Sequence, residues 1–209
     1  MRKVGAESQQ SWKTKSKAPD KRTFFQKYMS GFGLDVGFSG YEEDIVPILD
    51  TAIGVDLDYP GYDGITLPFP DNSQNYVFSS HCLEHIEDYI SVIQDWHRVV
   101  KIGGHIITVV PHKYLYEKKS SPPSNWNRDH KRFYTPATLI GEFEKALQPN
   151  SYRVRLLEDG DFGFDYSIPQ EKHSGGQYEI TLVIEKIKPP NWELEQSEED
   201  LRIEHGIYG

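Results

Sequence analysis

Apolar positions along the chain fall into short runs separated by amphipathic stretches, a pattern typical of a parallel β-sheet covered by helices. Four buried strands are expected up to residue 110, at 32–36, 51–55, 75–80 and 105–110. Two later runs, 152–157 and 178–185, alternate between apolar and polar residues. They are expected to form an antiparallel hairpin, and the glycine-containing loop 158–177 between them would be either its connection or a mobile flap.

Helical spacing of apolar residues predicts a long helix over 83–100, which would end before Gly103 and Gly104. A second helix is expected over 136–147, with Thr135 as its N-cap and a proline at its first position. Together these elements predict an α/β fold. The expected architecture is a Rossmann-like three-layer sandwich, with a mostly parallel sheet and the antiparallel hairpin at its C-terminal end.

The two ends of the chain differ in charge. Residues 1–22 are rich in lysine and serine and are expected to form a basic flexible tail. Residues 189–209 are rich in glutamate and are expected to form an acidic flexible tail. Residues 23–188 would then be the folded domain. The opposite charges would let the tails meet within one molecule or between two copies, as a homodimer.

Composition excludes several classes of protein. The chain has 23 Lys and Arg against 32 Asp and Glu, and a net charge of −9 disfavours a nucleic-acid partner. The single cysteine, Cys82, excludes an internal disulfide and a zinc site made of several cysteines. No apolar run approaches the roughly 20 residues that cross a bilayer, so no membrane span and a cytoplasmic location are expected.

A glycine and an acid follow the first two expected strands. Gly37 would let the backbone turn sharply and approach a ligand, because it has no Cβ. Asp56 would offer one carboxylate to both hydroxyls of a ribose. Taken singly, each residue is explained as well by an ordinary turn or a solvated strand end.

Five motifs occur in order between Leu34 and Gly104: Leu34-Asp-Val-Gly-Phe-Ser-Gly40, Gly54-Val-Asp-Leu57, Leu67-Pro-Phe-Pro-Asp-Asn-Ser73, Ser79-Ser-His-Cys-Leu-Glu-His-Ile86 and Arg98-Val-Val-Lys-Ile-Gly-Gly104. In this order the segment resembles the class I S-adenosylmethionine-dependent methyltransferases, in particular the methyltransferase type 11 group. The later segment Arg128-Asp-His-Lys-Arg-Phe-Tyr-Thr-Pro136 is similar to that family as well. The resemblance implies a methyltransferase with S-adenosyl-L-methionine as its cofactor.

The resemblance also implies where the cofactor binds. The residues expected to contact it are Asp35, Gly37, Phe38, Ser39, Gly40, Asp56, Leu57, Asp63, Gly64, Ile65, Leu67, Ser80 and His81. Asp63 matches the family position that accepts from the adenine amino group, and Ser80 and His81 match the turn that faces the methyl group.

The chain departs from the family pattern in two places. Only four residues separate Asp58 from Asp63, too few for the helix and strand that the family has there, so a sheet with fewer than seven strands is expected. Ser39 and Tyr41 stand at the second and third positions of the glycine-rich loop. These departures support an alternative, a non-catalytic module that keeps the fold and binds a partner. A dinucleotide oxidoreductase is disfavoured because the G-x-G-x-x-G fingerprint is incomplete.

Transfer to an oxygen atom would benefit from a general base. His81, His112 and His130 are the candidate catalytic residues, although each is equally explained as a surface or hydrogen-bonded histidine. His81, Glu84 and His85 also spell the H-x-x-E-H motif of a zinc protease. That interpretation is disfavoured because His81 falls at a strand-to-helix junction. No carboxylate cluster at ligand spacing is visible, so no metal ligand is predicted.

The segment 113–134 interleaves aromatic and basic side chains, a combination suited to a sugar ring that carries a phosphate or carboxylate. The residues expected to bind the acceptor are Tyr114, Trp126, Arg128, Arg132 and Tyr134. A solvated loop with aromatic residues folded beneath it is equally consistent with the pattern. The leading prediction is O-methylation of a saccharide in glycan biosynthesis, or of another small acceptor, and a nucleic-acid methyltransferase comes third.

Overall fold

The computed structural model describes residues 3–17, 21–38, 45–192 and 194 of the chain. A six-stranded sheet in the order β2-β1-β3-β4-β6-β5 forms its centre. Its strands are β1 Gly33–Val36, β2 Ala52–Val55, β3 Gln74–Ser80, β4 Val100–Pro111, β5 Tyr152–Gly160 and β6 Glu179–Lys186. Strands β1 to β4 pair in parallel, whereas β6 runs antiparallel to both β4 and β5. The predicted α/β fold with an antiparallel C-terminal hairpin is confirmed.

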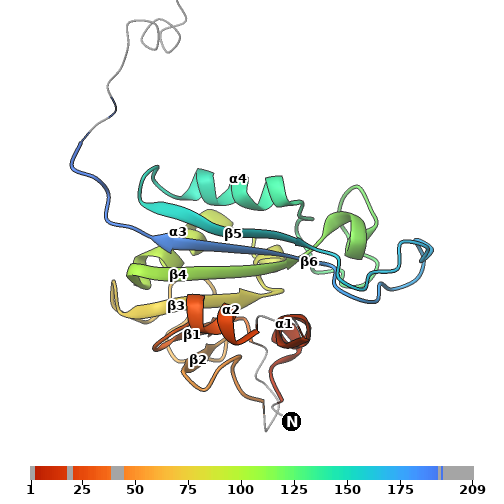
Figure 1. Ribbon diagram of the computed structural model, residues 1–209, viewed down its shortest axis with the longest axis horizontal. Coiled ribbons are helices and arrows are strands. Elements are labelled where there is room, and N and C mark those ends of the chain that lie inside the picture. The colour runs from red at the N-terminus through yellow and green to blue at the C-terminus, as the bar shows by residue number, and fades with distance from the viewer. Residues whose placement is uncertain (1–2, 18–20, 39–44, 193, 195–209) are drawn as a thin grey trace, which may run out of the picture.

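Helices cover both faces of the sheet, which makes three layers (Figure 1). The helical elements are α1 Ala6–Lys17, α2 Lys21–Tyr28, the short turn η1 Leu83–His85, α3 Tyr89–Val99, the short turn η2 Lys113–Glu117 and α4 Pro136–Ala146. The layers follow from the two-residue period of the strands. On β3, Tyr76 and Phe78 join one core cluster and Val77 joins the other.

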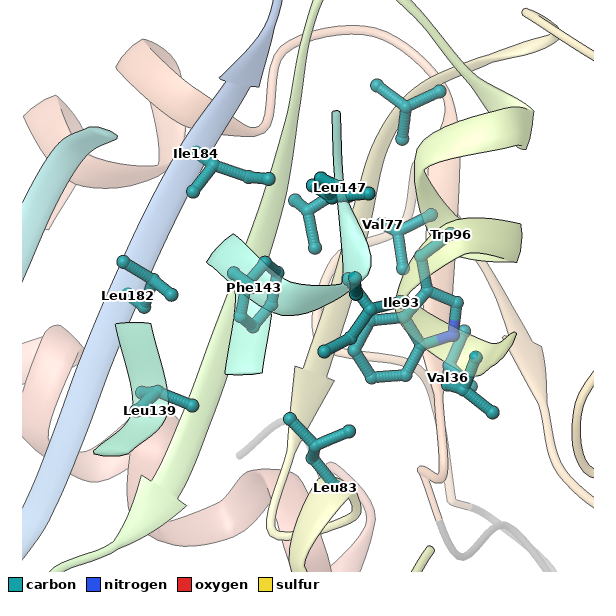
Figure 2. Packing of buried hydrophobic residues seen from close by; sticks show 14 of the residues in the cluster. Val36, Val77, Leu83, Ile93, Trp96, Leu139, Phe143, Leu147, Leu182 and Ile184 are labelled. Carbon is teal, nitrogen blue, oxygen red and sulfur yellow. The ribbon is translucent and has the colours of Figure 1, made fainter. Parts of the chain in front are cut away.

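The larger core cluster lies between the sheet and helices α3 and α4 (Figure 2). Trp96 and Ile93 of α3 meet Phe143 of α4 there, and Leu182 of β6 closes the cluster from the sheet side. The helix predicted over 136–147 is confirmed. Thr135 caps it, since its side chain accepts a hydrogen bond from Thr138 N.

The helix predicted over 83–100 is broken into two pieces. The turn η1 ends at His85, and α3 starts only at Tyr89, after Asp88 accepts a hydrogen bond from Ser91 N at 3.1 Å. An aspartate in this position caps a new helix better than it continues an old one. The break matters for the site because it turns the residues of η1 toward the carboxyl ends of the strands.

Residues 1–22 do not form a flexible tail where the structure describes them. Helices α1 and α2 pack on the sheet face opposite α3, and Trp12 stacks on Phe25 with ring centroids 5.7 Å apart. On α1, Ser8, Ser11 and Lys15 are buried, and with Trp12 they form a stripe at helical spacing. Because most of this stripe is polar, a search for apolar periodicity misses it.

The sheet is reduced where the sequence predicted it to be. Residues 56–73, between β2 and β3, contain turns and bends with no helix or strand. The predicted acidic tail 189–209 lies outside the described residues except for 189–192 and 194. Among the helices of the described ranges, none has the length and apolar character that crossing a membrane requires.

Candidate active site at the carboxyl ends of the strands

The four parallel strands end at the same edge of the sheet, and a candidate residue follows each of them. Gly37 follows β1, Asp56 follows β2, His81 follows β3 and His112 follows β4. Backbone hydrogen bonds tie the ends together: Gly37 N donates to Val55 O, and His81 N donates to Val109 O. Ligands of open α/β sheets bind at this edge.

Gly37 has a left-handed backbone with a φ of +75°. A Cβ added there would lie 2.5 Å from Cys82 Sγ, so the strand end and the η1 turn fit together only with glycine at this position. The ring of Phe38 lies against Gly54 of β2, where an added Cβ would be 2.5 Å from the ring. Ser39 and Gly40 fall outside the described residues, so their predicted role stays a prediction.

Asp35 is fully buried and serves the fold. Its Oδ2 accepts a hydrogen bond from Ile48 N at 2.7 Å, and Ser8 of α1 donates to the same carboxylate at 3.3 Å and 3.4 Å. The prediction that Asp35 contacts the cofactor directly is therefore corrected. This carboxylate joins α1 and the backbone before β2 to the central strand.

Asp56 lies half-buried at the end of β2 and accepts a hydrogen bond from Leu57 N at 2.8 Å. Leu57 beside it is 68% exposed, an unusual position for a leucine in the absence of a binding partner. An acid next to an exposed apolar side chain suits the ribose and base of a nucleoside.

Asp63 organises the turn that follows. Its Oδ1 accepts from Ile65 N at 2.9 Å and from Thr66 N at 2.6 Å, and these hydrogen bonds lower the pKa of the carboxyl. Gly64 has a φ of +90°, and the Ile65 side chain packs against the core. Asp63 therefore stays ionised at neutral pH in a turn that lies on the surface.

Sequence reasoning missed Tyr62 in the same turn. Burial raises the pKa of its hydroxyl, and the charges of Cys82, Asp56 and Asp63 raise it further. Tyr62 thus lies among residues from two separate motifs, Asp56 and Cys82, and from its own turn, Asp63. Leu67, by contrast, is buried, its N–H donates to Asp95 Oδ2 and its carbonyl accepts from Arg98, so its predicted contact with the cofactor is corrected to a packing role.

His81 has a left-handed backbone, with a φ of +51°, and its side chain is 12% exposed. Its Nε2 lies 2.9 Å from Oε1 of the fully buried Glu179, at the start of β6. Its Nδ1 lies 3.9 Å from Glu84 Oε1. A strained backbone conformation at a residue paired with a buried carboxylate is typical of a functional site.

Helix α1 reaches this pair. Ser80, buried before His81, has its Oγ 2.7 Å from Ser11 Oγ, and Ser11 donates to Glu179 at 3.4 Å. Lys15, one turn later, donates to Thr181 of β6 at 2.8 Å. Ser80 is thus held by the chain itself beside His81, and its predicted contact with the cofactor stays a prediction.

His112 has both ring nitrogens engaged within the protein. Nδ1 accepts from Tyr114 N at 3.0 Å and from Leu115 N at 3.3 Å, and Nε2 lies 3.3 Å from Asp159 Oδ1. Burial lowers the pKa of the imidazole, while the Asp159 charge opposes that shift. The ring caps η2, and its predicted catalytic role stays a prediction.

His130 lies deeper, and each of its two ring nitrogens lies near a buried carboxylate. Its Nδ1 is 2.5 Å from Oε1 of the buried Glu117, and its Nε2 is 3.9 Å from Glu84 Oε1. Because Glu84 Oε1 is equally far from His81 Nδ1, this carboxylate lies between the two histidines. Of the three catalytic candidates, His81 and His130 are brought together and His112 is not.

The predicted acceptor-binding residues divide by exposure. Tyr114 is 66% exposed and Arg128 is exposed, so both can meet a ligand from solvent. Trp126 is half-buried, donates from Nε1 to Tyr116 O at 2.9 Å and packs edge-on against His173. Figure 1 shows the loop 113–135 and the loop between β5 and β6 at the same end of the sheet.

Arg132 and Tyr134 are corrected to structural roles. The guanidinium of Arg132 donates to the carbonyls of Leu83, Ile86 and Glu87, which surround η1. The Tyr134 side chain is buried in the larger core cluster, and its hydroxyl donates to Glu142 at 2.7 Å. Both side chains are thus held by contacts within the chain.

Comparison with known proteins finds similarity in part of the sequence and in the fold. A family model described as a methyltransferase domain matches residues 49–108. Over 45 residues the chain is 42% identical to demethylmenaquinone methyltransferase from Staphylococcus epidermidis, which covers 22% of this chain and 19% of that protein. The aligned part is thus about a fifth of the length of the curated relatives.

Two solved structures show the extent of the shared fold. An S-adenosylmethionine dependent methyltransferase from Mesorhizobium loti matches 82% of this chain and 100% of its own at 12% identity, with a TM-score of 0.50. The [4+2]-cyclase SpnF matches 79% of this chain and 80% of its own at 13% identity, also with a TM-score of 0.50. The resemblance in the motifs is therefore confirmed as a class I methyltransferase fold. Because a cyclase shares that fold, the reaction has to be argued from the site.

Proposed function

We propose that this chain, which has the class I methyltransferase fold and a matched methyltransferase-domain segment, transfers a methyl group from S-adenosyl-L-methionine to a hydroxyl oxygen. The proposed acceptor is a saccharide or another small molecule. The observation that carries the proposal is the pair of His81 and buried Glu179, 2.9 Å apart, at the end of β3. This pair lies at the sheet edge that also holds Asp56 and Asp63.

The residues at the edge fit the cofactor. The half-buried Asp56 can accept from both ribose hydroxyls, the exposed Leu57 can cover the adenine ring, and Asp63 can accept from the adenine amino group. When bound, S-adenosyl-L-methionine supplies a methyl group on a sulfonium, a leaving group that needs no further activation. The protein then has to align the acceptor oxygen and to take its proton.

His81 is suited to that proton transfer. If Nε2–H donates to Glu179, the lone pair of His81 lies on Nδ1, the nitrogen 3.9 Å from Glu84 Oε1. Nδ1 takes the hydroxyl proton as the oxygen forms its bond to the methyl carbon. Buried Glu179 fixes the orientation of the ring and stabilises the imidazolium that results.

A charged saccharide is supported by the acceptor side of the site. Tyr114 offers an exposed ring and Arg128 an exposed guanidinium on the loop that follows β4. A tyrosine ring packs on the apolar face of a sugar, and a guanidinium pairs with a phosphate or carboxylate.

Cofactor binding is tested by isothermal calorimetry with S-adenosylmethionine and S-adenosylhomocysteine, with NAD as the control ligand. We expect Asp56→Ala to weaken binding of the first two by about tenfold to a hundredfold, because it removes hydrogen bonds to a charged acceptor. Asp58→Ala is the matched control, an exposed acid two positions later. Equal affinities for the two variants would remove Asp56 from the site.

The base is tested with a radiolabelled methyl group and a panel of neutral, phosphorylated and acidic sugars. We expect His81→Gln to lower turnover by about a hundredfold or more while the affinity for the cofactor changes little. Unchanged turnover would refute the role of His81, and transfer to none of the sugars would refute the acceptor class.

A non-catalytic binding module is the second candidate. The contacts of α1 favour it. Ser11 of this helix hydrogen-bonds to Ser80 and to Glu179, so a part of the chain itself contacts the two residues beside His81. Absence of binding of S-adenosylmethionine and S-adenosylhomocysteine in calorimetry would favour the binding module. If both bind, the assay of methyl transfer separates the two candidates.

A further inference from the structure

Three metal-ligating side chains meet beside His81, and methyl transfer uses none of them. One ligand atom each from Glu84, His85 and His130 can be chosen so that all three atoms lie within 4.8 Å of one another. Glu84 and His85 come from η1, and His130 comes from the loop 113–135. A backbone hydrogen bond of 2.7 Å from Lys131 N to Glu84 O fixes this loop against η1.

We propose that Glu84, His85 and His130 bind one divalent transition-metal ion, of which Zn²⁺ is the best match. Two imidazoles and one carboxylate are a common ligand set for zinc, with further positions left open for water or a substrate oxygen. Mg²⁺ prefers oxygen ligands, so a set with two nitrogens disfavours it. Of the H-x-x-E-H pattern only Glu84 and His85 belong to the proposed metal site, because His81 pairs with Glu179 instead.

The surroundings of His130 support a ligand role. Its Nδ1 lies 2.5 Å from Glu117 Oε1, and both residues are buried. A carboxylate that holds one nitrogen of a histidine fixes the tautomer and directs the other nitrogen at a metal. Here that other nitrogen, Nε2, is the one that lies 3.9 Å from Glu84 Oε1.

His85 completes the set from the more exposed side. Its ring lies edge-on to His130 with centroids 4.7 Å apart. Burial is the largest of the effects that together lower its pKa to about 4; the charges of His130, His81 and Lys131 act in the same direction, and the charge of Asp129 opposes them. Since Glu84 and His130 are buried, the ion would enter past His85.

The position of the site suggests what the metal does. Glu84 lies between His130 and His81, so a metal on Glu84 would be close to the acceptor side of the active site. A Lewis acid there would polarise an acceptor hydroxyl and help His81 to take its proton. This role rests on the proposed methyl transfer, whereas metal binding does not.

The test is a titration of the full chain, without a polyhistidine tag, after treatment with a chelator. Zn²⁺ is added in competition with a chromophoric chelator. We expect one Zn²⁺ per chain and a higher melting temperature with Zn²⁺ than without it. His85→Gln should abolish the tight site and the shift in melting temperature, and Glu117→Gln should weaken binding by about tenfold to a hundredfold. A chain that binds no Zn²⁺, or a His85→Gln variant that binds it like the wild type, would overturn the proposal.

His105→Gln is the matched control. His105 is a part-buried histidine on β4 whose Nε2 lies 4.0 Å from Glu185 Oε2 on β6, and its variant should bind Zn²⁺ like the wild type. If circular dichroism shows that His85→Gln does not fold, X-ray absorption of the zinc-loaded wild type decides. Scattering from two imidazoles supports the site, and a shell of oxygen atoms alone refutes it. Displacement of Zn²⁺ by Mg²⁺ would refute the metal class. Calorimetry of S-adenosylmethionine on His85→Gln shows separately whether the cofactor site is intact.

Discussion

Arg128 and Arg132 lie in the same loop and are both predicted to bind the acceptor, but their surroundings differ. Arg128 is exposed, whereas the guanidinium of Arg132 donates to three carbonyls around η1 and lies 3.4 Å from Glu142. It also stacks over the ring of Tyr89. A planar fork with five donors can serve all of these partners at once, and a lysine cannot.

Arg132→Lys should therefore destabilise the protein although it keeps the charge. We expect the free energy of unfolding to fall by about 1.5–3 kcal/mol, the range for hydrogen bonds to a charged group. Arg128→Lys is the control and should change it by less than about 0.5 kcal/mol. Urea unfolding at pH 7 measures the free energy of unfolding of both variants. Equal values would show that the guanidinium of Arg132 is not needed to hold the carbonyls around η1.

Residues that follow a strand directly were predictable, and residues that depend on tertiary contact were not. Gly37, Asp56 and His81 each follow an expected strand, so their place at the sheet edge came from the alternation of apolar runs alone. Glu179 gave no local signal, because only the antiparallel pairing of β6 with β4 brings it to His81. Tyr134 was misassigned because an aromatic residue in a polar loop reveals nothing about its burial.

Among the elements, helix α1 shows where hydrophobic periodicity fails. Its packed stripe consists of Ser8, Ser11, Trp12 and Lys15, which has one large apolar member. Strands and α4 were predictable because their periods of two and of 3.6 are carried by apolar residues. The break after η1 was not predicted, because Ile86 and Ile90 keep the helical spacing of apolar residues across it.

Trp12 should therefore be the main apolar anchor of α1. We expect Trp12→Ala to loosen the helix and to speed cleavage by trypsin after Lys13 and Lys15, since Lys15 is buried while α1 is docked. Trp192→Ala is the matched control, because Trp192 is 61% exposed and lies far along the chain from α1. Time courses of limited proteolysis compare them. Cleavage at the wild-type rate in Trp12→Ala would mean that the polar contacts of Ser8 and Ser11 hold α1 by themselves.

At the scale of the whole molecule, buried histidines couple stability to pH. Burial lowers the pKa of His97, of His105 and of His112 from the ordinary value of 6.5. A nearby Glu185 opposes the shift at His105, and Asp159 opposes it at His112, yet burial outweighs both. At a pH between the folded and unfolded pKa values, the unfolded chain binds more protons than the folded one.

Stability should consequently be greatest above about pH 6.5 and should fall as the pH drops below that value, well before the carboxylates titrate. Urea unfolding at pH 7.5, 6.5, 5.5 and 5.0 measures the trend, and NMR titration of the imidazole protons locates each pKa. The double variant His97→Gln and His105→Gln should reduce the dependence, because it removes two of the four imidazoles whose pKa burial lowers and leaves His85 and His112. Stability that stays constant from pH 7.5 to 5.5, or a double variant with the wild-type slope, would show that these rings are protonated as readily in the folded chain as in the unfolded one.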